Sequence, residues 1–121
     1  MEGNMPATHH VTVYPDHCSN KVAPPHQPAG RGDTIVFHTS ANYLALFFPP
    51  GAPFEFEGDK STAGKQGWIV VDLDRGATQT VRVRDDAEPG AYPYAVYCHD
   101  SDPRMRGFAK GGSDPEIIIY E

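Results

Sequence analysis

Positive charge is scarce in this chain and is nowhere concentrated. Ten lysines and arginines are spread over 121 residues, against sixteen acidic residues, which gives a formal net charge of −6. A protein that binds a phosphate backbone needs clustered lysine and arginine, so the sequence argues against nucleic acid as a partner. The acidic balance favours solubility, and it would also attract a basic protein partner.

Long apolar runs and helical periodicity are missing as well. No stretch approaches the roughly 20 consecutive apolar residues of a membrane helix, so we expect no membrane span. No window of about a dozen residues repeats apolar side chains at the helical spacing. Twelve glycines and twelve prolines interrupt nearly every segment, which favours short strands joined by turns over helices.

The common catalytic motifs are also absent. The sequence contains neither a Gly-x-Ser-x-Gly nucleophile turn, nor a phosphate-binding glycine loop, nor a His-Glu-x-x-His zinc motif. Asp85, Asp86 and Glu88 precede a Pro-Gly turn, where adjacent carboxylates are typical of a solvated hairpin tip. We therefore expect that this chain is not an enzyme.

What the sequence does contain is a series of short strand patterns. Apolar segments bounded by proline, glycine or polar turns predict strands at residues 10–14, 33–39, 43–48, 68–73, 78–84, 91–98 and 116–120. Strands of this number and spacing predict an all-β fold, an antiparallel Greek-key β-sandwich, in a single domain over residues 1–121. The irregular segment 49–67 is interpreted as a long excursion with room for one short helical turn.

The last third of the chain carries the most specific pattern. A Gly-x-Tyr-x-Tyr strand over residues 90–94 leads to Cys98, and Met105 and Gly107 follow a few residues later. This arrangement resembles the copper-binding end of the cupredoxins, the blue copper family. The resemblance implies a type 1 copper site, which is built from two histidines, one cysteine and a weak axial methionine.

Other parts of the chain resemble cupredoxin segments in the same order. They comprise residues 22–24, the start of a strand at 32–37, the strand at 44–47, the turn and strand at 73–81, and the closing strand at 117–119. In the family, the strand that 44–47 resembles carries the first copper histidine. The resemblance covers nearly the whole chain and implies the cupredoxin fold. It says less about function, because one fold hosts many functions.

The copper ligands that the resemblance implies are only partly present. It places the first histidine at or near Leu44, but residues 40–48 contain no histidine. His38 lies nearby in sequence, yet Ile35 and Phe37 have the alternation of core residues, so His38 should point away from the core. We expect His38 and three further histidines to be solvated and inert; these are His9, His10 and His26.

The second copper histidine is missing from its implied place too. Residues 101–103 are Ser, Asp and Pro, and the loop's one histidine is His99, directly beside Cys98. Neighbours on a strand face opposite sides, so Cys98 and His99 share a site only if the backbone turns between them. The sequence therefore predicts that a standard type 1 site is not formed.

The two cysteines leave three alternatives, namely a disulfide, two thiols or metal ligands. The resemblance implies that the loop with His17 and Cys18 lies at the same end of the sandwich as Cys98. A Cys18–Cys98 disulfide would require an oxidising compartment. An atypical site for copper or zinc would use His17, Cys18, Cys98 and His99, with Met105 nearby. We favour the disulfide or two thiols over this site.

These observations predict a cupredoxin-like domain with a degenerate type 1 copper site, which acts as a binding or interaction module for an unidentified protein partner. The alternative is a copper protein with an atypical ligand set around Cys98, in copper handling or electron transfer. The resemblance implies a periplasmic or secreted protein. Residues 1–10 are polar and lack the apolar segment of a signal peptide, so a cytoplasmic location is also possible.

Overall fold

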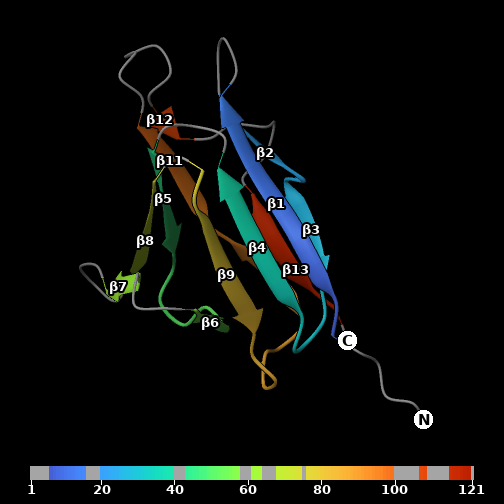
Figure 1. Cartoon of the computed structure of the whole chain (residues 1–121). Coiled ribbons are helices and arrows are strands. Elements are labelled where there is room, and N and C mark those ends of the chain that lie inside the picture. The colour runs from blue at the N-terminus through green and yellow to red at the C-terminus, as the bar shows by residue number, and fades with distance from the viewer. Residues whose placement is uncertain are drawn as a thin grey trace.

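The fold was determined as a computed structural model of the whole chain (Figure 1). The structure describes residues 6–15, 20–39, 43–57, 61–63, 68–74, 76–99, 107–108 and 115–120. Within these ranges every regular element is a β-strand. No described helix is long and apolar enough to cross a membrane.

Three sets of hydrogen-bonded strands make up the fold. The first sheet has the order β2-β1-β4-β9-β6 and comprises Asn20–Ala23, Thr8–Pro15, Thr34–Thr39, Thr78–Val83 and Phe54–Phe56. The second has the order β10-β13-β3 and comprises Gly90–Pro93, Glu116–Ile119 and His26–Ala29. The third has the order β12-β11-β5-β8-β7 and comprises Gly107–Phe108, Ala95–His99, Tyr43–Phe48, Ile69–Asp74 and Ser61–Ala63.

Two of these sheets are connected by one continuous segment. β10 pairs with β13, the chain passes Tyr94, and β11 then pairs with β5. The β8, β5 and β11 strands lie on one side of the molecule and β4 and β1 on the other (Figure 1). The result is a β-sandwich in which strands distant in sequence lie side by side, as Greek-key connections require.

The core is formed by the inward faces of these strands. Alternate positions are fully buried in β4 (Ile35 and Phe37) and in β9 (Val81 and Val83). The aromatic centre comprises Phe37, Phe48 and Tyr94, whose ring centroids lie 5.4 to 6.0 Å apart. Burial of such alternating faces is the main force that fixes strand register.

The seven strands that the sequence predicts are confirmed, with small shifts at their ends and with the strand at 91–98 divided at Tyr94 into β10 and β11. Two pairs are parallel, however, namely β1 with β4 and β3 with β13. The predicted all-β sandwich is thus confirmed, and two of its sheets each contain one parallel pair beside their antiparallel pairs. Parallel pairing joins strands through a crossover, and alternation of apolar residues along one strand does not reveal its neighbour.

The excursion at 49–67 differs from its interpretation. Its described part contains the short strands β6 and β7 and no helical turn. Phe54 and Phe56 of β6 pack edge-on against Phe48. This aromatic packing explains why the segment adopts extended backbone at the edge of the first sheet.

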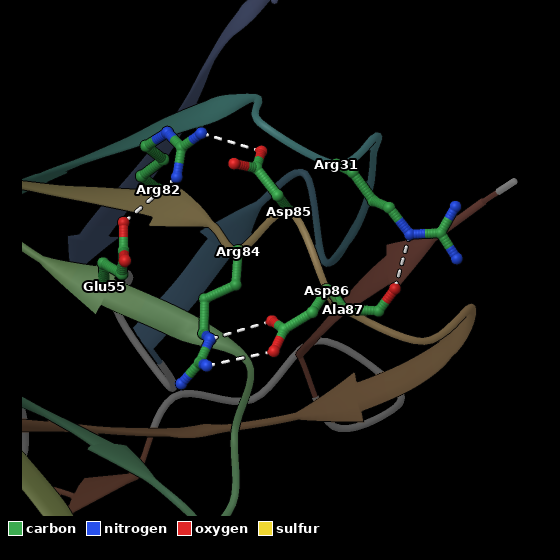
Figure 2. A network of polar contacts seen from close by, with 7 residues as sticks. All are labelled: Arg31, Glu55, Arg82, Arg84, Asp85, Asp86 and Ala87. Atoms are coloured by element: carbon green, nitrogen blue, oxygen red, sulfur yellow. Dashed lines mark hydrogen bonds and ion pairs between the residues drawn. The ribbon is translucent and has the colours of Figure 1, made fainter.

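The turns at one end of the sandwich are held by polar contacts (Figure 2). Arg84 donates from Nε and Nη2 to the two carboxylate oxygens of Asp86, at 3.0 and 3.1 Å. Arg82 donates to Asp85 at 2.8 Å and to Glu55 at 3.1 Å. The carboxylates after β9 are exposed, as expected. The turn is not a hairpin tip, however, because β9 and β10 belong to different sheets and do not pair with each other. Exposed ion pairs of this kind add little to stability.

The turn before β4 is organised by Asp33. Its carboxylate accepts hydrogen bonds from the backbone N–H groups of Ala7 at 2.9 Å and Gly30 at 2.8 Å, and it contacts His9 Nε2 at 2.9 Å. Gly32 has a φ of +82°, a conformation that favours glycine. The Gly32-Asp33 pattern therefore forms the turn at the start of β4 that the sequence predicts.

Candidate functional site

The candidate site lies at the end of the sandwich where β11 finishes. The last residue of β1, the first residue of β5 and the β11–β12 pair lie at this same end (Figure 1). The start of β4 and the end of β9 lie at the opposite end (Figure 1). The strands that lead into the loop after β1 and the loop after Cys98 thus end on the same side of the fold.

Cys98 is a core residue of β11. Its exposed fraction is 1%, and its cross-strand partners are Leu44 of β5 and Gly107 of β12. Residues opposite each other in an antiparallel pair have their side chains on the same face. Whatever stands at position 44 is therefore a direct neighbour of the Cys98 side chain.

Leu44 fills the position that the resemblance assigns to the first copper histidine. It is fully buried, and its partner on the other side, Leu73 of β8, is only 1% exposed. The neighbours of Cys98 across the sheet are thus apolar at the place where a copper site needs an imidazole. The described residues around Cys98 do not fit a type 1 copper site.

His38 lies where the alternation predicts. Its strand neighbour Phe37 is fully buried, whereas His38 is partly exposed on the outer face of the first sheet. Its Nε2 atom lies 2.8 Å from Nδ1 of His10. His38 is therefore engaged with another histidine on that outer face.

His99 continues β11 without a break. Its backbone is paired with Tyr43, in the same ladder that pairs Cys98 with Leu44. The turn between Cys98 and His99 that a shared site would require is thus not made. The side chain of His99 lies outside the described part of the structure.

The remaining predicted site residues, His17, Cys18 and Met105, also lie outside the described residues. Only the ends of their loops can be placed. Pro15 pairs with Asn20 around the loop that holds His17 and Cys18, and Cys98 pairs with Gly107 around the loop that holds Met105.

The disulfide between Cys18 and Cys98 gains no support. Cys98 is buried, and Cys18 lies outside the described residues, so the disulfide stays a prediction. The described residues also contain no group of three or more His, Cys, Asp or Glu side chains placed to hold a metal ion. The described residues next to Cys98 on β5 and β8 are therefore the buried apolar side chains of Leu44 and Leu73.

Three histidine contacts were not anticipated from the sequence. His9 contacts Asp33, and His26 Nδ1 lies 2.9 Å from Glu116 Oε2. His10 contacts His38. His10 and His26 are exposed, as expected, whereas His9 is partly buried, and each of the three makes a polar contact that the expectation of inert histidines did not include. Each contact joins residues at least 24 positions apart in the sequence, which strand alternation does not reveal.

These strands and their connections define a cupredoxin fold. Solved structures of amicyanin mutants match the chain across most of its length: a methionine-to-alanine mutant in its Cu(I) form has a TM-score of 0.52 and 13% identity, and a reduced tryptophan-to-tyrosine mutant has 0.51 and 17%. Each match covers 92% of this chain and 82% of the amicyanin chain. At such identities the likeness concerns the fold alone.

The sequence comparisons give no match. No family model matches the chain, and no curated protein matches its sequence. The fold is thus recognised from the arrangement of strands rather than from overall similarity of sequence.

Proposed function

We propose that this protein is a cupredoxin-like binding module whose type 1 copper site has degenerated, and that it contacts a protein partner instead of carrying electrons. The observation that carries the proposal is the pairing of Cys98 with Leu44. A buried leucine contributes apolar contacts to the core, whereas the imidazole that it replaces would supply a metal ligand.

The fold provides a rigid scaffold for the loops of such a binding module. At the Cys98 end the described strands surround a continuous core, which includes Leu44, Leu73, Val96 and Cys98. Loops that start from a rigid sheet are the usual carriers of binding residues. The loops that start from this end at 16–19, 40–42 and 100–106 would then form the contact surface.

The experiment that tests the proposal is copper loading of the reduced protein, followed by absorption spectroscopy and metal analysis. The proposal predicts no intense visible band of a copper–thiolate bond and no bound copper that depends on Cys98. Cys98→Ala is the variant for comparison, since alanine is tolerated better than a polar residue at a buried site. An intense band in the orange-red region that Cys98→Ala abolishes would refute the proposal.

A second candidate function is metal binding at an atypical site around Cys98. The observation that favours it is the pairing of Cys98 with Gly107. Met105 precedes Gly107 by two residues in the sequence. His17 and Cys18 follow β1 in the sequence, and β1 ends at this same end of the sandwich (Figure 1). With His99, these residues would offer two thiolates and two imidazoles to copper or zinc.

The number of metal ions bound per chain distinguishes the second candidate function from the first. It predicts about one Cu⁺ or Zn²⁺ per chain under reducing conditions, lost in Cys98→Ala and in Cys18→Ala. A thiol titration of the native protein completes the test. Two thiols that react before denaturation would eliminate the disulfide, and one mole of bound metal that protects both would support this candidate.

The compartment and the partner are part of the proposal. Resemblance to cupredoxins favours a periplasmic or secreted protein, with the cytoplasm as the alternative. The net charge of −6 favours a partner with a basic contact surface. A partner of this type should dissociate more readily as salt concentration rises.

A further inference from the structure

The outer face of the first sheet carries a pair of histidines. Nδ1 of His10 and Nε2 of His38 lie 2.8 Å apart, and the ring centroids are 5.0 Å apart at an interplanar angle of 34°. We propose that His10 and His38 form a binding site for a divalent transition-metal cation, with Cu²⁺ and Ni²⁺ preferred. The site is independent of Cys98 and of the proposed function.

The distance between His10 Nδ1 and His38 Nε2 can be compared with the distance between two nitrogen ligands of one metal ion. Metal–imidazole bonds are about 2.0 Å long, so two ligands at a right angle place their nitrogens about 2.8 Å apart. A tetrahedral ion with the same bond length would need about 3.3 Å. The observed 2.8 Å is also the length of the hydrogen bond between the two rings, so it shows only that both nitrogens come close enough to share one cation once their lone pairs turn toward it. The preference for Cu²⁺ and Ni²⁺ follows from their high place in the affinity order of divalent metals for imidazole ligands.

The two histidines are held by the centre of the sheet. β4 is bonded on both sides, to β1 and β9, whereas β1 is bonded to β4 at His10 and to both β4 and β2 from Thr12 onward. Thr12 pairs with His38 and His10 pairs with Val36, so the two histidines occupy diagonal positions on one face. Beneath them the buried residues Val11 and Phe37 anchor the strands. Ligands on such rigid strands are preorganised for binding.

Metal binding requires a change in the protons of the pair. In the present contact one of the two facing nitrogens must carry the hydrogen and the other must accept it. To bind one cation, both facing nitrogens must present lone pairs. Each neutral ring can hold its single proton on the far nitrogen, His10 Nε2 or His38 Nδ1, so a neutral pair binds the ion without net proton release.

The rest of the coordination shell would be water. Among described residues no third His, Cys, Asp or Glu side chain completes a cluster. Thr12 and Thr78 are the cross-strand neighbours of His38 and could hydrogen-bond to bound water. His10 is exposed and His38 is partly exposed, so a cation reaches the pair directly from solvent.

The test is a titration of the reduced full-length protein with NiCl₂, because Ni²⁺ accepts imidazole ligands without oxidising thiols. The variants are His10→Gln, His38→Gln and the matched control His26→Gln, whose histidine pairs with Glu116 on a different sheet. Loss of an outer-shell group alone costs about 10–100-fold in metal affinity. His10→Gln and His38→Gln should therefore each weaken Ni²⁺ binding at least tenfold, and His26→Gln should leave it unchanged.

A second measurement on the unchanged protein locates the ion. Substoichiometric Ni²⁺, which is paramagnetic, should broaden the NMR signals of His10, His38, Thr12 and Thr78 first. The proposal is overturned if His10→Gln and His38→Gln change the affinity no more than His26→Gln does. It is equally overturned if the broadening centres on Cys98, which would instead support an atypical site at that end.

Discussion

At the scale of single residues, Leu44 decides the chemistry next to Cys98. Leu44 is fully buried and directly opposite Cys98. Leu44→His should lower the free energy of unfolding by at least about 2 kcal/mol, because it removes apolar packing and buries a polar ring. Urea unfolding measures the loss. Leu46→His, at an equally buried position of β5, is the matched control and should be destabilised similarly.

The same variant also tests the copper interpretation. Leu44→His restores one imidazole, while residues 101–103 still contain no histidine. We therefore expect no copper–thiolate absorption from Leu44→His. A variant that remained as stable as the parent and gained this absorption would show that the second ligand is already present.

Tyr92 and Tyr94 differ in whether the side-chain hydroxyl forms a hydrogen bond in the described structure. The Tyr94 hydroxyl is buried without a hydrogen-bond partner in the described structure, and burial raises its pKa. The Tyr92 hydroxyl donates to the carbonyl of Glu88 at 2.6 Å. Tyr94→Phe should leave the free energy of unfolding unchanged or raise it by up to about 1 kcal/mol, whereas Tyr92→Phe should lower it by about 0.5–1.5 kcal/mol. The reverse order in thermal or urea unfolding would contradict this assignment.

Asp33 makes stability depend on acid pH. Burial raises its pKa, but the hydrogen bonds from Ala7 and Gly30 and the contact with His9 together outweigh burial, so the pKa lies below its ordinary value of 3.8. The ionised form is thus favoured by folding. Its contribution is fully present above the unfolded pKa and is lost as the pH falls through the lower folded pKa.

Asp33→Asn measures this contribution. Loss of the charged hydrogen bonds should lower the free energy of unfolding at pH 7 by about 1.5–3 kcal/mol. The difference between the parent and Asp33→Asn should shrink as the pH falls below about 4. A difference that stayed constant from neutral pH down to about pH 3 would show that Asp33 acts through packing and not through its charge.

At the scale of elements, the turn before β4 depends on backbone conformation. Gly32 has a φ of +82°, and a Cβ there would lie 3.5 Å from the Asp85 carboxylate. Gly32→Ala should therefore lower the free energy of unfolding by about 1–2 kcal/mol through backbone strain. Gly30→Ala is the comparison, since its Cβ would meet only the exposed Tyr120 ring at 3.3 Å. Equal losses in the two variants, measured by urea unfolding, would contradict the role of the positive φ.

The strands differ in how well the sequence predicts them. Long alternating segments such as β4 and β9 could be predicted, because each buries one complete face. The short edge strands β2, β3 and β6 could not. β3 contains Pro28, and proline is tolerated at a sheet edge because no donor is needed there. Its partner β13 is parallel and distant in the chain, so no local pattern marks the pair.

The positions of the two histidines of the proposed cation site also differ in how well the sequence predicts them. Alternation in β4 places His38 on the outer face, but the position of His10 beside it requires the β1–β4 register. Cys98 and Leu44 were aligned by the family resemblance, and the β5–β11 register confirms that they are neighbours. Resemblance over ordered segments can thus place residues that local patterns leave apart.

At the scale of the whole molecule, the residues that determine the sandwich fold differ from the residues that a copper site requires. The fold depends on many buried positions, among them Ile35, Phe37, Val81 and Ile117. A type 1 site depends on four ligands only. Loss of one imidazole therefore removes the site while the core and the strand order remain. The chain has the cupredoxin arrangement of strands, with Leu44 at the position that the resemblance assigns to the first copper histidine.

The most direct test of this account is the visible absorption spectrum of the reduced full-length protein loaded with Cu²⁺. The account predicts no intense band from a copper–cysteine bond, and copper that remains bound should be lost in His10→Gln and His38→Gln but retained in Cys98→Ala. An intense orange-red absorption that disappears in Cys98→Ala and persists in His10→Gln would contradict the account, because it would show a working copper–thiolate site at the Cys98 end.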